Sequence, residues 1–313
     1  MRGKSLIPFI LGLALLLPLL GPGPYHLSLL NSALVITLLT LSWDLLGGVA
    51  GQVSLGQALF LGLGAYGFSL LSTYLPPAGA ALATAVVGTA FAAFFGLFAS
   101  RLEGIFFALF TLCSAEVFHE ATMNIPFILK GVEVGGEGGV PCLGGAGILS
   151  LRGLVVEYYS LLLFTASVGW FLLRTLRHPV GLKLRGIAEN ELLARATGLP
   201  VERLKFGAFV ASGVLGVVAG IFSALHSGRA TPSDFSLELS FQAATLSALG
   251  GRGTVTGPAL TAVAVSYLFG ALDVPPQVRL SLYAILLPAI LLDLPRKALG
   301  LLRGSRTPLS SRQ

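Results

Sequence analysis

The sequence predicts an all-α, polytopic membrane protein of about ten transmembrane helices with both termini in the cytoplasm. Three observations support this fold class. Hydrophobic residues make up 54% of the 313 positions and charged residues only 11%, whereas soluble domains carry about 25% charged residues. Glycine occurs 40 times, as expected where helix backbones approach closely in lipid. Apolar stretches long enough to cross a bilayer recur along the whole chain.

Ten apolar stretches are candidate spans, and together they predict one transmembrane domain over residues 1–313. The first also resembles a signal peptide, but it lacks a small-x-small cleavage site, so we expect a retained span. The first and eighth are short, which is compatible with a tilted, broken or re-entrant helix. The stretches are Leu6–Leu20, Leu27–Leu46, Leu55–Leu75, Ala78–Ser100, Ile105–Met123, Tyr158–Leu176, Phe206–His226, Leu239–Gly251, Val255–Leu272 and Leu280–Leu294.

The distribution of Lys and Arg predicts the orientation, because cytoplasmic loops carry most of the basic residues. Ten spans with a cytoplasmic N-terminus place 16 of the 20 basic residues on the cytoplasmic side. Residues 177–205 then form a cytoplasmic loop and residues 124–157 a periplasmic loop, which either serves the outer mouth or a partner or is a passive connector. Basic residues placed in this way do not indicate nucleic-acid binding. The two cysteines, Cys113 and Cys142, predict neither a disulfide nor a metal site.

A polar, glycine-rich motif opens the third span. Its side chains Gln52, Ser54 and Gln57 are costly in lipid, so we expect them to face either a water-filled pathway or hydrogen-bonding partners on other helices. The following Gly62-x-Gly64-x-x-Gly67 matches a dinucleotide fingerprint in letters only. That fingerprint requires a preceding strand, and here it lies inside a membrane stretch, so we interpret these glycines as helix-packing positions.

Acidic residues inside the spans are a second departure from apolar filler. Asp44 lies in the second stretch, and Glu116, His119 and Glu120 share one face of the fifth. We expect structural or entrance-lining roles for them. Proton coupling is the alternative, because such clusters also form proton relays in ion-coupled transporters.

The cytoplasmic loop contains an amphipathic helical pattern from Leu184 to Ala196. Gly198 suits a left-handed helix stop, and Pro200 suits the first turn of the next helix. Such a helix either lies in the lipid interface or docks into a groove on a soluble partner. Its mixed charges, including Glu189 and Arg195, favour a protein partner over an anionic lipid surface.

Three motifs in order resemble one family. They are Gly51-Gln52-x-Ser54-Leu55-Gly56 continuing to Gly62-x-Gly64-Ala65-Tyr66, then Pro179-x-Gly181 continuing through Glu189-Asn190-Glu191 to Gly198, and Leu249-Gly250-Gly251-x-Gly253-Thr254-x-x-Gly257-Pro258. Together they resemble the permease subunits of branched-chain amino acid ABC importers, of the LivM/LivH type. The resemblance implies a bacterial or archaeal inner-membrane protein that works with a second permease subunit, two cytoplasmic ATPase subunits and a periplasmic binding protein.

The resemblance also implies a role for the cytoplasmic loop. The coupling segment would seat in a groove on one ATPase, through Arg185, Glu189, Asn190, Glu191, Ala194 and Gly198. Candidates for the translocation pathway are Gln52, Ser54, Gln57, Tyr66 and Glu116. Candidates for helix packing are Gly62, Gly64, Gly216, Gly220, Gly250 and Gly251. We expect no catalytic residue, cofactor or metal, and the sequence has no phosphate-binding loop of the Gly-x-x-x-x-Gly-Lys-Ser/Thr type.

Three alternatives remain open at the level of sequence. Related importers carry urea, short amides or sugars, so the substrate class is not fixed. A stand-alone, ion-coupled secondary transporter would use Glu116 or Asp44. A membrane scaffold without transport activity is the third, and the polar and glycine-rich segments inside the membrane argue against it.

Overall fold

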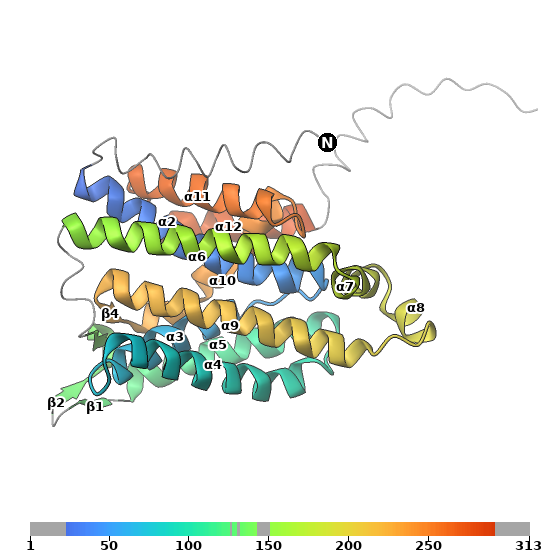
Figure 1. Ribbon diagram of the computed structural model, residues 1–313, viewed down its shortest axis with the longest axis horizontal. Coiled ribbons are helices and arrows are strands. Elements are labelled where there is room, and N and C mark those ends of the chain that lie inside the picture. The colour runs from blue at the N-terminus through green and yellow to red at the C-terminus, as the bar shows by residue number, and fades with distance from the viewer. Residues whose placement is uncertain (1–22, 126, 130–131, 143–150, 292–313) are drawn as a thin grey trace, which may run out of the picture.

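The computed structural model describes residues 23–125, 127–129, 132–142 and 151–291 as a bundle of helices (Figure 1). The predicted first span, Leu6–Leu20, lies outside these residues. The helices are α2 (Pro24–Trp43), α3 (Gln57–Leu71), α4 (Pro77–Ala99), α5 (Gly104–Asn124), α6 (Leu151–Arg177), α7 (Pro179–Glu189), α8 (Glu191–Ala196), α9 (Val201–Ser227), α10 (Leu237–Gly250), α11 (Thr256–Ala271) and α12 (Pro276–Leu291). The π-helix η2 (Asp44–Val49) continues α2, and two 3₁₀ turns are η3 (Gly136–Gly138) and η5 (Pro232–Phe235).

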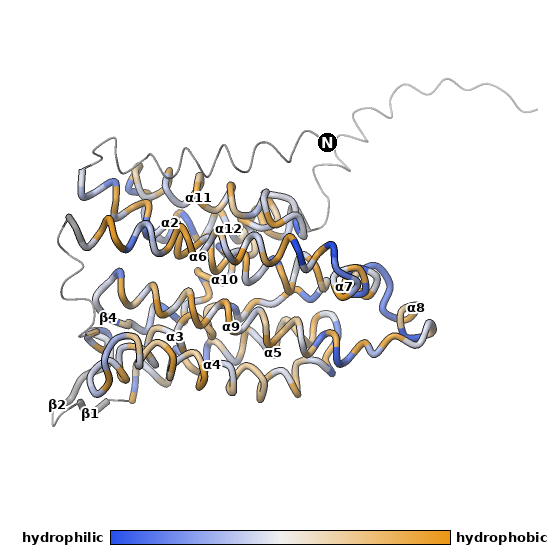
Figure 2. Tube along the Cα trace, viewed as in Figure 1, coloured by the Kyte–Doolittle hydropathy of each residue, from blue (hydrophilic) through white to orange (hydrophobic). Residues whose placement is uncertain are grey.

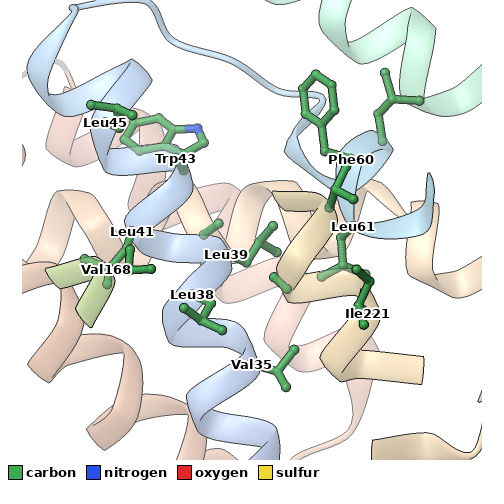
Figure 3. Packing of buried hydrophobic residues seen from close by; sticks show 14 of the residues in the cluster. Val35, Leu38, Leu39, Leu41, Trp43, Leu45, Phe60, Leu61, Val168 and Ile221 are labelled. Atoms are coloured by element: carbon green, nitrogen blue, oxygen red, sulfur yellow. The ribbon is translucent and has the colours of Figure 1, made fainter. Parts of the chain in front are cut away.

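Helix α2 lies at the centre of the bundle, against α6, α9, α10 and α11. It is apolar on all sides rather than amphipathic, which is the pattern of a helix surrounded by other helices. Figure 3 shows Leu39 of α2 on the side that faces Leu61 of α3 and Ile221 of α9, and Leu41 on the opposite side of α2 beside Val168 of α6. These side chains belong to one continuous core of buried residues that joins all of these helices.

Five helical segments in the described part of the chain are long and apolar enough to cross a membrane. They are Pro24–Val49, Pro77–Ala99, Gly104–Asn124, Gly153–Arg177 and Val201–Ser227, and the apolar helices Gln57–Leu71 and Thr256–Ala271 are shorter. Large apolar side chains such as Leu82 and Phe94 of α4 and Trp170 of α6 are exposed on the outside of the bundle. Figure 2 shows apolar residues along the whole bundle and hydrophilic residues around α7. The fold is therefore that of an all-α, multi-pass membrane protein.

Two of the predicted spans are short helices. Each lies next to an interruption of the helical conformation, which we call a helix break. The predicted span Leu55–Leu75 is α3, which has 15 residues and begins at Gln57 after an extended segment. The predicted span Leu239–Gly251 is α10, which has 14 residues. Glycines with positive φ mark both breaks, because Gly51 has a φ of 72° and Gly251 has a φ of 95°. The breaks place backbone polar groups and polar side chains inside the bundle.

The bundle has two different ends (Figure 1). Helices α7 and α8 project at one end, which we call the α8 end. Short antiparallel strands lie at the opposite end, the strand end: β1 (Phe127–Leu129) pairs with β2 (Val132–Val134), and β3 (Val140–Pro141) pairs with β4 (Arg229–Ala230). The β3–β4 pair attaches the segment after α5 to the segment after α9. Helix α6 begins at Leu151, earlier than the predicted span that starts at Tyr158.

Candidate functional site

Gln57 and two serines form a buried polar cluster where α2, α3 and α9 cross. The Gln57 amide donates to the hydroxyl oxygens of Ser42 and, at 3.0 Å, of Ser212. Each serine hydroxyl also donates to the other serine's carbonyl oxygen, at 2.7 and 2.8 Å. The Gln57 side-chain oxygen is buried and accepts no hydrogen bond among the described residues. Gln57 therefore joins three helices and still carries one buried acceptor that no described residue uses.

Gln52 and Ser54 lie in the extended segment that links η2 to α3. The Ser54 carbonyl oxygen accepts from the Trp43 indole N–H at 2.7 Å, and the Ser54 hydroxyl accepts from the Gly56 N–H at 3.3 Å. The Gln52 amide oxygen is buried and accepts no hydrogen bond in the described part of the chain. Both residues face protein rather than lipid, in agreement with the cost of a polar group in hydrocarbon.

The glycines predicted to pack helices lie at close contacts. A Cβ added at Gly64 would overlap the Val217 carbonyl oxygen, and one at Gly220 would overlap the Leu61 carbonyl oxygen, so α3 and α9 approach through glycine from both sides. Gly62 lies under the Phe235 ring, and Gly216 lies against Phe60. Gly250 lies against the backbone of Gly257, whereas Gly251 makes no such close contact and instead adopts a positive φ.

Asp44 is fully buried where α2 passes into the π-helix η2. Its Oδ1 atom accepts from the Ser247 hydroxyl at 2.7 Å and from the Gly253 N–H at 2.8 Å. Its Oδ2 atom accepts from the Val255 N–H at 3.4 Å. The carboxylate is therefore satisfied by α10 and by the segment that links α10 to α11.

The acidic face of α5 makes hydrogen bonds to other residues than Asp44 does. His119 donates from Nδ1 to the Pro232 carbonyl oxygen of η5 at 2.8 Å, and Glu120 accepts from the Asn124 side chain at 3.3 Å. Glu116 is half-buried on the same helix. Tyr66 of α3 is buried, and its ring lies 5.5 Å from that of Phe235 in η5. The structure thus brings Tyr66 and the α5 face together around η5, and leaves Asp44 in a separate network.

The predicted amphipathic helix is two helices, and this corrects the sequence prediction. Asn190 leaves the helical conformation at φ −156°, and its side chain accepts from the Leu193 N–H at 3.0 Å, so it ends α7 and caps the start of α8. Capping by Asn competes with helix continuation. Gly198 has the predicted left-handed conformation, at φ 78°. The N–H groups of Gly198 and Leu199 bond back to Arg195 and Ala194, which completes a Schellman motif.

The apolar face of this segment is divided between the chain itself and solvent. Ile187, Ala194 and Val201 pack together in a small cluster of their own, so α7 and α8 fold back onto the start of α9. Leu192 and Leu193 of α8 are instead exposed, at 79% and 63%. Leu192 and Leu193 therefore form an exposed apolar pair at the end of a charged segment.

An ion-pair network fixes α8. Glu191 binds the Lys205 ammonium at 2.6 Å and the Arg195 guanidinium at 2.9 Å, and Arg195 also reaches Glu103 at 2.7 Å. Burial alone would raise the pKa of Glu191, but the hydrogen bonds from Lys205 and Arg195 outweigh it and hold this pKa below its ordinary value. The hydrogen bond to Glu191 raises the pKa of Arg195. Lys205 is only 2% exposed, so this pair is a buried one on the lysine side.

A cavity of about 370 Å³ lies beside this network. Its walls are the segment Ala50–Val53, the first turn of α5 from Gly104 to Ala108, and the end of α7 at Ile187 and Ala188. Glu191 and Lys205 complete the lining. The cavity therefore separates α7 and α8 from α5 at the α8 end of the bundle.

The sequence prediction missed one polar cluster, at the strand end. The Glu157 carboxylate binds His226 Nδ1 at 2.8 Å, and His226 Nε2 lies 3.0 Å from the Ser32 hydroxyl. These groups join α6, α9 and α2. Glu157 falls at the edge of a predicted loop and His226 at the end of a predicted span, so no spacing along the sequence connects them.

Comparison with known proteins identifies the family. The family described as "Branched-chain amino acid transport system / permease component" matches residues 25–292, which includes almost all of the described helices. The chain belongs to this permease family. By its description, this family consists of permease components of transport systems.

Curated relatives of the permease agree with this assignment. It is 26% identical over 263 residues to the high-affinity branched-chain amino acid transport system permease protein LivM of Salmonella typhimurium, and equally to that of Escherichia coli. Each match covers 74% of this chain and 59% of the relative, so the chain spans a little more than half of their length. The ribose import permease protein RbsC of Haemophilus influenzae is 30% identical over 112 residues, which is 34% of each chain. No solved structure matches the chain significantly.

Proposed function

We propose that the chain is the transmembrane permease subunit of an ATP-driven importer for branched-chain or related apolar amino acids. In this proposal it pairs with a second permease subunit, two cytoplasmic ATPases and a periplasmic binding protein in an inner membrane. About ten spans place both termini and the α8 end in the cytoplasm, and the strand end faces the periplasm. The match to LivM over most of the chain supports amino acids over sugars. The shorter match to a ribose permease makes a sugar the second candidate.

The observation that carries the coupling role is the exposed surface of α8. Leu192 and Leu193 are exposed on a helix that the ion pair of Glu191 with Lys205 connects to α9. Glu189 and Asn190, at the junction of α7 and α8, are exposed beside them. A preorganised helix with apolar anchors and a charged rim fits a groove on a soluble partner. We propose an ATPase as that partner.

Co-purification from native membranes and uptake by the reconstituted complex test the proposal. We expect the second permease and both ATPases to co-purify, and ATP to drive uptake of leucine, isoleucine or valine into proteoliposomes that contain the binding protein. Uptake of ribose but not of these amino acids would favour the sugar candidate. Proton-driven uptake by the purified chain alone would refute the proposal in favour of an ion-coupled transporter.

Variants at the α7–α8 junction test the coupling role. Glu189→Trp changes an exposed side chain, so the fold should persist while docking is blocked, and uptake should fall by at least about tenfold, or about 1.4 kcal/mol. Ala194→Trp should have the same effect on uptake, but it also disturbs the small cluster with Ile187 and Val201. Ser167→Trp is the matched control, because Ser167 is exposed on α6 within a membrane segment. Unchanged uptake in Glu189→Trp would contradict the coupling role.

A further inference from the structure

The segment between α10 and α11 contains backbone strain that Asp44 holds in place. Val255, at the start of α11, has a φ of 64°, although a β-branched side chain strongly disfavours this region. Strain of this kind persists only where surrounding contacts fix the backbone. Here the N–H groups of Gly253 and Val255 both point to the Asp44 carboxylate. A negative charge is also favourable at the N-terminus of a helix such as α11.

Asp44 sits at a second irregularity, on its own helix. It is the first residue of the π-helix η2, and isolated π segments are common at functional positions. Gly48, one turn further on, has no side chain, and a Cβ there would overlap both Asp44 and the Gly253 N–H. The helix break after α2 and the helix break after α10 therefore meet at the Asp44 carboxylate.

Helix α7 contacts both breaks. The Arg185 guanidinium donates to the Gly253 carbonyl oxygen at 2.9 Å, so Gly253 is held by Asp44 on its N–H and by Arg185 on its C=O. Ala188, one turn further along α7, lies on Gly51, where an added Cβ would come within 2.7 Å of the Ala188 methyl group. Gly51 also requires its positive φ of 72°. The same face of α7 thus contacts both helix breaks, through Arg185 and Ala188, which are three residues apart in the sequence.

We propose that Asp44 is a positioning residue. It links the two helix breaks to each other and to α7, so that the three segments move as one unit. When α7 is displaced, the segment before α3 and the segment before α11 then move together with it. Helix α7 does not slide past them. The cavity beside Ala188 and Ile187 leaves room for such a displacement relative to α5. This inference rests on the proposed function, because the displacement of α7 would come from the ATPase docked at the α8 end.

A buried carboxylate suits this role better than a purely packing residue. It accepts from three donors on two elements, and hydrogen bonds to a charged group are stronger than neutral ones. Arg185 also interacts electrostatically with it. Its removal would leave the N–H groups of Gly253 and Val255 buried without their acceptor, so the break would be free to rearrange independently of α2.

Hydrogen exchange on the purified full chain tests the link directly. In Asp44→Leu we expect amides in both 251–258 and 181–189 to exchange at least about tenfold faster, a change of about 1.4 kcal/mol in opening free energy. Asp44→Asn keeps an oxygen acceptor for Ser247 and Gly253 but loses the charge and the acceptor for the Val255 N–H, so its exchange should be faster than in the native protein and slower than in Asp44→Leu. Thr40→Val is the matched control, because the buried Thr40 hydroxyl donates, among the described residues, to the Ile36 carbonyl oxygen of its own helix. Faster exchange in 251–258 with unchanged exchange in 181–189 would overturn the proposal.

Transport by the whole complex gives the functional readout. We expect Asp44→Leu to raise the ATP hydrolysed per amino acid imported by at least about tenfold, Asp44→Asn to raise it by a smaller factor, and Thr40→Val to stay close to the native ratio. An unchanged ratio in Asp44→Leu would also overturn the proposal. Where Asp44→Leu does not fold, Ser247→Ala removes one donor and should raise exchange in both segments by a smaller factor, and no change in 181–189 would count against the link. If the native complex shows no ATP-driven uptake, the proposed function fails, and the exchange result still decides the role of Asp44.

Discussion

The pair formed by Glu191 and Lys205 predicts an asymmetric response to mutation. Lys205 is 2% exposed and bonds, among the described residues, to Glu191, whereas the Glu191 side chain is 23% exposed and also binds Arg195. Glu191→Ala therefore leaves a buried ammonium without its partner. Lys205→Met leaves a carboxylate that keeps Arg195 and some contact with water.

The expected sizes follow from this difference in exposure. Removing one partner of a buried ion pair costs about 3 kcal/mol at the low end of the usual range, which fits a pair that is buried on one side only. Opening of α8 should then be about a hundredfold easier in Glu191→Ala. Lys205→Met should cost less than about 1 kcal/mol, because the remaining pair with Arg195 is largely exposed.

Hydrogen exchange of the amides in 191–205 measures this opening in the detergent-solubilised chain. We expect a far larger increase in Glu191→Ala than in Lys205→Met at neutral pH. Equal effects, or a larger effect of Lys205→Met, would refute the reasoning. The same measurement tests pH dependence: because the pKa of Glu191 is lowered on folding, its contribution is complete above the ordinary glutamate pKa of about 4.3 and is lost as pH falls through the lower, folded value.

The other predictions concern the membrane helices and are read from thermal unfolding in detergent. Gly220→Ala should cost about 1–3 kcal/mol by forcing α3 away from α9, whereas Gly207→Ala, with open space at the same helix, should be neutral or stabilising. Gln57→Leu should cost less than about 1 kcal/mol, because it also removes a buried acceptor that has no partner. Glu157→Leu should cost about 1–3 kcal/mol and Glu157→Gln less, since Gln keeps an acceptor for His226; equal losses would contradict the pair at the strand end.

Local signals in the sequence predicted much of the segment at the α8 end. Gly198 was expected as a left-handed stop and has that conformation, because few other residues adopt a positive φ without strain. The helix break at Asn190 was not predicted. The periodicity of Leu184, Ile187 and Ala194 continues across it, and only the cap at Leu193 shows that the chain turns there.

The ends of α3 show what hydropathy does not detect. The predicted span Leu55–Leu75 extends beyond both ends of α3, because hydropathy does not register where the helical conformation begins and ends, whereas the predicted span Leu239–Gly251 agrees with α10 to within two residues. Backbone polar groups in the helix breaks are satisfied by distant residues, such as Thr111, whose hydroxyl accepts from the Leu55 N–H at 3.1 Å. Tertiary contacts of this kind leave no mark in local composition.

Composition and motif order by themselves determined the fold class and the family. An apolar chain with few charges must bury its helices in lipid, and three motifs in order distinguish one transport family from others. Only the tertiary structure decided which polar residues meet. Asp44 and Gly253 are 209 positions apart, and Glu157 and His226 are 69 apart, yet each pair is in hydrogen-bond contact. The physical reason is that lipid sets the requirement to satisfy a polar group, but the packing of helices determines which partner satisfies it.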